Sequence, residues 1–167
     1  MALVVVLATL LGVSLAETAP KLADPRLCGD GNWLYFENNC YTLLTGSYTW
    51  NQFWAVCTQE YNAVGATIFS ATENQFVWAM FGGQNRDRNA WLGGNRIGRE
   101  HPDFRWQDGT GMSYTNWAPG EPNNGGIGGP EQECMIIRED DGKWDDIECD
   151  LEKIGICKKA ANVPLVE

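Results

Sequence analysis

The sequence predicts an α+β fold, with two helices packed on small antiparallel sheets and a long irregular loop region. Two amphipathic stretches, within residues 50–64 and 71–81, predict the helices. From Ala90 onward, apolar residues come in short bursts separated by glycine, asparagine and proline, which is typical of short strands and turns. The segment from Gly109 to Pro130 has too many glycines and prolines for regular structure, and a loop of that length in a compact domain is usually functional or disordered.

The N-terminus predicts export from the cell. Met1 to Ala16 is an uncharged apolar run with small residues at Ser14 and Ala16, which indicates a secretory signal peptide cleaved before Glu17. The run is short for a membrane span and no second long apolar stretch follows it, so we expect no membrane anchor. An uncleaved anchor is the alternative. Residues 17–27 contain two prolines and little periodicity, and indicate a flexible lead-in.

Composition narrows the class further. After the predicted cleavage about 150 residues remain, the size of one domain with a single core. The formal charge of −10 argues against a nucleic-acid partner, because a polyanion would be repelled. Six cysteines in a secreted chain of this size predict three disulfides, although spacing alone leaves their pairing open. No Cys-x-x-Cys pair supports a zinc or redox site.

The first half of the domain predicts a hairpin and then a helix. Residues 32–45 alternate aromatic and polar side chains, which indicates an early β-hairpin. Thr49, followed three residues later by Gln52, is a capping-box signal. The apolar residues that follow share one helical face and predict a helix ending near Gly65: Trp50, Phe53, Trp54, Cys57, Tyr61 and Val64.

A second helix and several strands follow. Ser70 with Glu73 repeats the capping signal, and an apolar stripe then precedes a Gly82-Gly83 stop: Phe76, Val77, Met80 and Phe81. We expect both helices to pack against the same sheet. Strands are predicted at residues 90–93, at 104–106 before an Asp108-Gly109 turn, at 134–138 and at 154–158.

The chemistry-bearing stretch runs from Glu121 to Asp146. Side chains with oxygen atoms recur along it, whereas histidine is absent and its cysteine is assigned to a disulfide. Oxygen ligands without histidine or thiolate suit a hard cation, so the sequence predicts a Ca²⁺ site rather than a zinc site.

The triplets Glu121-Pro122-Asn123 and Trp144-Asp145-Asp146, placed on either side of Cys134, resemble motifs of the C-type lectin-like domain, the calcium-dependent sugar-binding module of extracellular animal proteins. The resemblance extends to the long form of that family, which has an extra N-terminal hairpin. It implies a carbohydrate-recognition domain at residues 28–159, a tail at 160–167 and a cis peptide bond before Pro122. It also implies three disulfides: Cys28–Cys40, Cys57–Cys157 and Cys134–Cys149.

Carried over residue by residue, the resemblance implies five calcium ligands: Glu121, Asn123, Gln132, Asp145 and Asp146. The first four would also bind the carbohydrate. The usual mannose-type site of the family has glutamate at the position of Gln132 and asparagine at that of Asp145. The two departures keep the total of three carboxylates and two amides, so we expect calcium affinity typical of extracellular modules, about 0.1 to 1 mM.

The sugar preference follows less directly. The Glu-Pro-Asn order of Glu121 and Asn123 implies mannose, fucose or N-acetylglucosamine. At Gln132 and Asp145 the acceptor and donor are exchanged relative to the usual mannose-type site. This exchange resembles the galactose-type pattern, placed on the other side of the calcium ion, so a galactose-type lectin is the alternative. In either case the implied partners are terminal sugars of cell-surface or microbial glycans. The resemblance thereby implies a role in innate immunity.

Several other hypotheses stay open. Asn124 with Glu133 is a candidate pair for a second, weaker calcium ion, and Glu131 or Glu133 could replace Gln132 as a ligand. Some members of the family bind protein, lipid or ice, so a non-sugar ligand is a further alternative. An enzyme is disfavoured, because the only histidine, His101, sits in a predicted loop and no nucleophile motif occurs. Since one sugar site is weak, a homo-oligomer would be one way to gain avidity.

Overall fold

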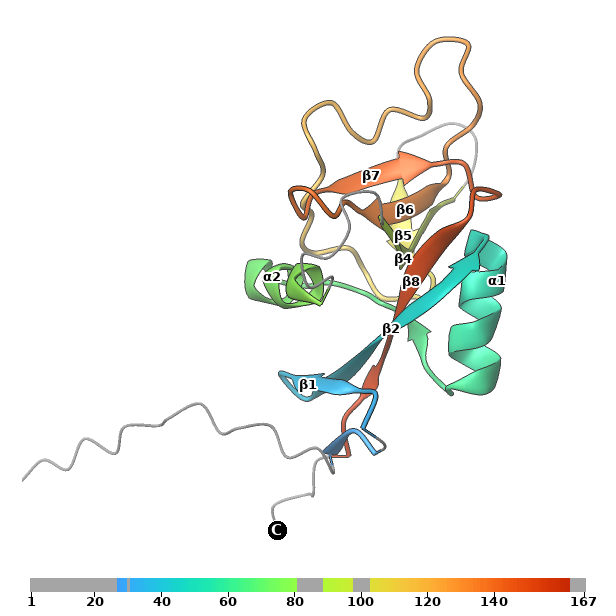
Figure 1. Ribbon diagram of the computed structural model, residues 1–167. Helices are drawn as coiled ribbons and strands as arrows, with labels where there is room; N and C mark the ends of the chain where they lie inside the picture. The colour runs from blue at the N-terminus through green and yellow to red at the C-terminus, as the bar shows by residue number, and fades with distance from the viewer. Residues whose placement is uncertain (1–26, 30, 81–88, 98–102, 163–167) are drawn as a thin grey trace, which may run out of the picture.

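The computed structural model describes residues 27–29, 31–80, 89–97 and 103–162 (Figure 1). The predicted signal peptide, residues 17–26 of the lead-in, the Gly82-Gly83 stop, His101 and the end of the tail lie outside these residues. Among the helices that the structure describes, none has the length and apolar character needed to cross a bilayer.

Eight strands in the described part of the chain join in one sheet. Its main path runs β1-β2-β8-β4-β6-β7, while β3 pairs with β8 and β5 pairs with β4. The strands are β1 (Leu34–Phe36), β2 (Asn39–Tyr48), β3 (Val64–Gly65), β4 (Ala90–Arg96), β5 (Phe104–Trp106), β6 (Cys134–Ile137), β7 (Trp144–Ile147) and β8 (Lys153–Ala160).

The α+β class is confirmed, but the predicted small antiparallel sheets are corrected to one mixed sheet. All strand pairs are antiparallel except β4 with β8, which is parallel. The C-terminal strand β8 pairs with β2, β3 and β4. It therefore joins the N-terminal hairpin to the strands of the second half of the chain. No local sequence pattern predicts these pairings.

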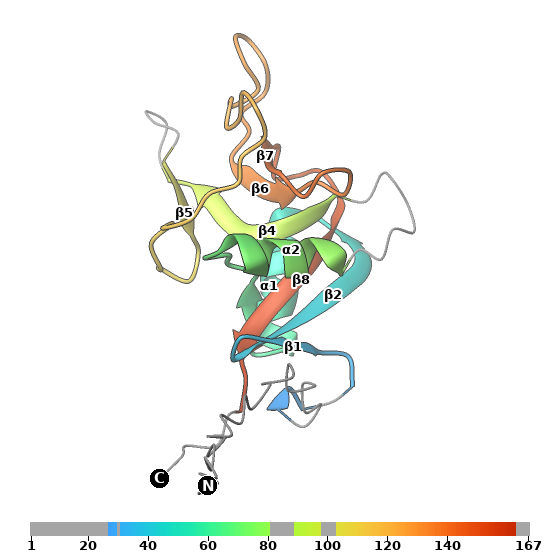
Figure 2. The same ribbon diagram turned by 90° about the vertical axis from the view of Figure 1, so that its left-hand side faces the viewer.

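The sheet has two apolar faces, and one helix covers each. Residues of β2, β4, β6 and β8 alternate between two clusters, so that Leu92 joins one cluster and Trp91 the other. Helix α2 (Ala71–Ala79) contributes Val77 to the first cluster, and helix α1 (Trp50–Ala55) contributes Phe53 to the second. Figures 1 and 2 show the two helices on opposite sides of β2 and β8. The expectation that both pack on the same sheet is confirmed.

The first helix starts as predicted and ends earlier. Thr49 accepts a hydrogen bond from the backbone of Gln52, whose side chain accepts one in return. After α1 the chain continues in a π-helical turn, η2 (Val56–Glu60). Asn62 then takes a left-handed conformation with φ 48°, which stops the helix. The predicted end near Gly65 is wrong, because Val64–Gly65 is strand β3, paired with β8.

The three disulfides join Cys28 to Cys40, Cys57 to Cys157 and Cys134 to Cys149, which is the pairing that the family resemblance implies. The Cys57–Cys157 bond spans 100 residues and ties the π-helical turn η2 to β8. The Cys134–Cys149 bond links the start of β6 to the turn after β7. These two strands border the site described below.

A buried ion pair lies between helix α2 and strand β8. The Lys158 Nζ donates to Glu73 Oε1 at 2.6 Å, and both residues are only 5% exposed. The other oxygen of Glu73 accepts from the backbone N–H of Phe69 at 2.7 Å, and the Tyr41 hydroxyl donates to the first. The backbone N–H of Glu73 donates to Ser70, so the predicted cap is present. The Glu73 side chain, however, serves the ion pair and not a reciprocal capping box.

Candidate metal centre

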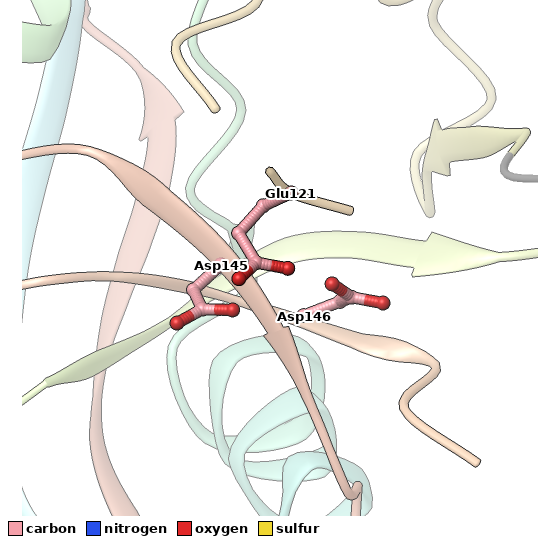
Figure 3. A group of neighbouring side chains, drawn as sticks. All are labelled: Glu121, Asp145 and Asp146. Atoms are coloured by element: carbon pink, nitrogen blue, oxygen red, sulfur yellow. The ribbon is translucent and has the colours of Figure 1, made fainter. Parts of the chain in front are cut away.

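Three carboxylates meet where the long loop crosses strand β7. Glu121 comes from the loop, and Asp145 and Asp146 come from the strand; one oxygen from each lies within 4.8 Å of the other two. In Figure 3 the Glu121 carboxylate lies between those of Asp145 and Asp146. Within the described residues, no other group of three or more acidic, histidine or cysteine side chains has this geometry.

The loop is held on β7 by backbone hydrogen bonds around Trp144. The Trp144 N–H donates to the Asn116 carbonyl at 2.8 Å, and the Ala118 N–H donates to the Trp144 carbonyl at 2.8 Å. The Glu121 N–H then donates to the Ala118 carbonyl at 3.0 Å, which turns the chain back over the strand. The Trp144 side chain is fully buried and packs edge-on against three rings: Trp106, Tyr114 and Trp117.

Asp146 fixes the next part of the loop. Its two carboxylate oxygens accept hydrogen bonds from the backbone N–H groups of Asn123, at 2.9 Å, and Asn124, at 2.8 Å. The bond from Glu121 to Pro122 is cis. Because Asp146 is 1% exposed, its hydrogen bonds to the loop are shielded from water.

The cluster has unbalanced negative charge. Burial raises the pKa of Glu121, and repulsion from Asp145 and Asp146 raises it further. Burial also raises the pKa of Asp145, with a smaller contribution from Asp146, while Arg138 opposes the shift. One buried oxygen of Glu121, Oε2, has no hydrogen-bond partner among the described residues. Three crowded carboxylates and an unsatisfied oxygen fit a cation that prefers oxygen ligands, as calcium does.

Of the five predicted ligands, three belong to the carboxylate group and two are amides. Glu121, Asp145 and Asp146 form the carboxylate group. Asn123 is exposed next to Glu121, and its side chain lowers the pKa of that carboxyl by hydrogen bonding. Gln132 lies at the other end of the loop and is half-buried. Its backbone N–H donates to Asn124 Oδ1 at 3.0 Å.

That last bond gives Asn124 a role that the sequence interpretation missed. Asn124 has φ 53°, and its side-chain oxygen closes the loop onto Gln132. Asparagine followed by glycine is a turn signal, so the left-handed conformation could have been found, but its partner eight residues away could not. Glu131 and Glu133 lie outside the carboxylate group.

Comparison with known proteins identifies the family of this domain. The family model described as the lectin C-type domain matches residues 46–159. The low affinity immunoglobulin epsilon Fc receptor of mouse is 34% identical over 118 residues, which cover 71% of this chain and 33% of the receptor. The CD209 antigen of Nomascus concolor is 35% identical over 141 residues, 81% of this chain and 32% of that protein. The chain thus spans about a third of the length of these two relatives.

Solved structures give the same result. The cow C-type carbohydrate-recognition domain of CD23, crystallised in the presence of a GlcNAc2Man3 oligosaccharide, matches with a TM-score of 0.70 and 29% identity, covering 80% of this chain and 97% of that one. A calcium-independent type II antifreeze protein matches with a TM-score of 0.68 and 26% identity, covering 79% and 94%. The chain described here belongs to the C-type lectin domain family.

Proposed function

We propose that this protein is a secreted lectin that binds glycans only when calcium is present. The ion would be held by the five residues predicted from the sequence: Glu121, Asn123, Gln132, Asp145 and Asp146. The observation that carries this proposal is the meeting of three carboxylates within 4.8 Å, one of them with a buried oxygen that has no hydrogen-bond partner in the described part of the chain. A calcium ion takes six to eight oxygens, so it supplies positions that two neighbouring sugar hydroxyls can fill.

The protein side chains would share those hydroxyls with the ion. The Glu121 and Asp145 carboxylates accept hydrogen bonds, and the Asn123 and Gln132 amides can donate them. Asp146 has both oxygens engaged by the loop backbone, so its part is to hold the loop in place as well as to add charge. The proposed activity is binding rather than catalysis.

The order of Glu121 and Asn123 favours mannose, fucose or N-acetylglucosamine over galactose. Gln132 and Asp145 carry the reverse order of acceptor and donor, and a galactose-type lectin is therefore the alternative. Terminal sugars of cell-surface or microbial glycans are the proposed partners. A single site of this kind has an affinity of about 1 mM, so useful binding would require several sites, for example in a homo-oligomer.

A mannose column tests both the mechanism and the preference. We expect the protein to be retained in calcium, released by chelator and released by free mannose before free galactose. The double variant Glu121→Gln/Asn123→Asp exchanges one acceptor and one donor, and should change the mannose-to-galactose affinity ratio about tenfold, or roughly 1.4 kcal/mol.

Three outcomes would count against parts of this proposal. Release by galactose but not by mannose contradicts the preference, and retention that persists in chelator contradicts the mechanism. A protein that binds no glycan in calcium would instead favour a non-sugar ligand, the second candidate, which the likeness to a calcium-independent antifreeze protein supports.

A further inference from the structure

Residues 124–130 form a narrow projection next to the metal centre, here called the glycine finger. Between Asn124 and Pro130 it contains four glycines and one other residue, Ile127. In Figures 1 and 2 this part of the chain projects beyond β7, away from the sheet. The Ile127 side chain is fully exposed, at 111% of its reference area.

The finger is folded tightly on itself, so its tip is held in place relative to the carboxylates. The Gly126 N–H donates to the Asn123 carbonyl at 3.1 Å, and Asn124 Oδ1 closes the base by accepting from Gln132. The Gly125 and Gly129 backbones lie so close that a Cβ on Gly129 would stand 2.0 Å from the Gly125 carbonyl oxygen. Only glycine fits this approach.

Both ends of the finger adjoin proposed ligands. Asn123 immediately precedes the finger, and Gln132 follows it by two residues. A sugar bound at the metal centre would therefore lie at the base of the finger, and a group attached to that sugar would extend along it. Because glycine has no side chain, Ile127 is the one side chain that the finger presents between Asn124 and Pro130.

We infer that Ile127 makes a second contact with the ligand by packing against an uncharged apolar substituent linked to the bound sugar. This inference rests on the proposed lectin function and specifies its ligand class, namely glycosides with an alkyl, acyl or aromatic group. The surroundings favour a neutral group, since Glu131 and Glu133 stand beside the finger in a chain of net charge −10. Removing apolar area of Ile127 from water supplies the affinity.

The test compares two probes that share one sugar: methyl α-mannoside and octyl α-mannoside below its micelle concentration, each titrated into the full secreted chain in calcium. The native protein should bind the octyl glycoside about fivefold more tightly, a gain that matches contact with part of one aliphatic side chain. The ratio should fall to about one in Ile127→Ser and be retained in Ile127→Leu. Since each ratio is taken within one protein, any general change in sugar affinity cancels.

The outcomes separate this inference from the function on which it rests. Equal binding of the two mannosides by the native protein, or an unchanged preference in Ile127→Ser, overturns the role of Ile127 and leaves the lectin proposal standing. A preference for the octyl glycoside that survives chelator also overturns it, because the contact would not depend on the bound sugar. If the protein binds neither of the two mannosides and neither of the matching galactosides, both the role of Ile127 and the lectin proposal are overturned.

Discussion

Replacing Asp146 by asparagine is expected to weaken calcium binding at least about a hundredfold, or roughly 2.7 kcal/mol. The change removes one of three charges in the carboxylate group. It also replaces one acceptor oxygen with an amide nitrogen, which cannot accept, so one of the two backbone N–H groups of Asn123 and Asn124 loses its acceptor. The loop that carries Glu121 would lose part of its attachment to β7. A calorimetric calcium titration measures the effect.

Asp150→Asn is the matched control, because Asp150 is an exposed aspartate four residues further along that lies outside the carboxylate group. Its calcium affinity should stay within about twofold of the native value, since surface charges at a distance are screened. Equal calcium affinity in Asp146→Asn and the native protein would show that the ion is not bound where we place it.

The second large effect concerns stability. Replacing Glu73 by glutamine should cost about 3 to 5 kcal/mol in the free energy of unfolding, because Lys158 would keep its charge in a buried position without a carboxylate. The double variant Glu73→Gln/Lys158→Met removes both charges and should recover much of that loss. Urea unfolding of the disulfide-intact native protein, single variant and double variant measures the three free energies of unfolding. A double variant no more stable than the single one would contradict this account.

An exposed ion pair provides the comparison. Arg138 Nη2 and Asp140 Oδ2 are 3.0 Å apart, and the two side chains are 30% and 59% exposed, respectively. Arg138 lowers the pKa of Asp140 by hydrogen bonding. Even so, Asp140→Asn should cost less than about 1 kcal/mol, because water screens the pair. Equal losses from Asp140→Asn and Glu73→Gln would mean that burial of the Glu73–Lys158 pair does not set its contribution.

Features encoded by neighbouring residues were predictable from the sequence. The hairpin of β1 and β2 and the start of both helices follow from local alternation and capping residues. The end of the first helix was not predictable in this way, because Val64–Gly65 continues the apolar pattern and is drawn into pairing with β8, which lies far away in the sequence. The joining of the eight described strands into one sheet depends on the pairing of β8 with β2 and β4, which also lie far away in the sequence.

The candidate site divides in a similar way. The family resemblance implied Glu121, Asp145 and Asp146 as ligands, and the structure brings these three together. What spacing did not indicate is how the loop is held. The hydrogen bonds that Asp146 accepts from two backbone N–H groups, and that Asn124 accepts from the Gln132 N–H, depend on the loop folding back over β7. The pairing of Glu73 with Lys158 was missed because Glu73 also fits a local capping pattern.

The central claim is that the crowded carboxylates of the long loop and β7 bind calcium, and calorimetric titration of the native, fully oxidised protein tests it most directly. We expect saturable heat for one ion per chain with a dissociation constant of about 0.1 to 1 mM. Absence of any binding heat at calcium concentrations up to about 10 mM, tenfold above that range, would contradict the claim.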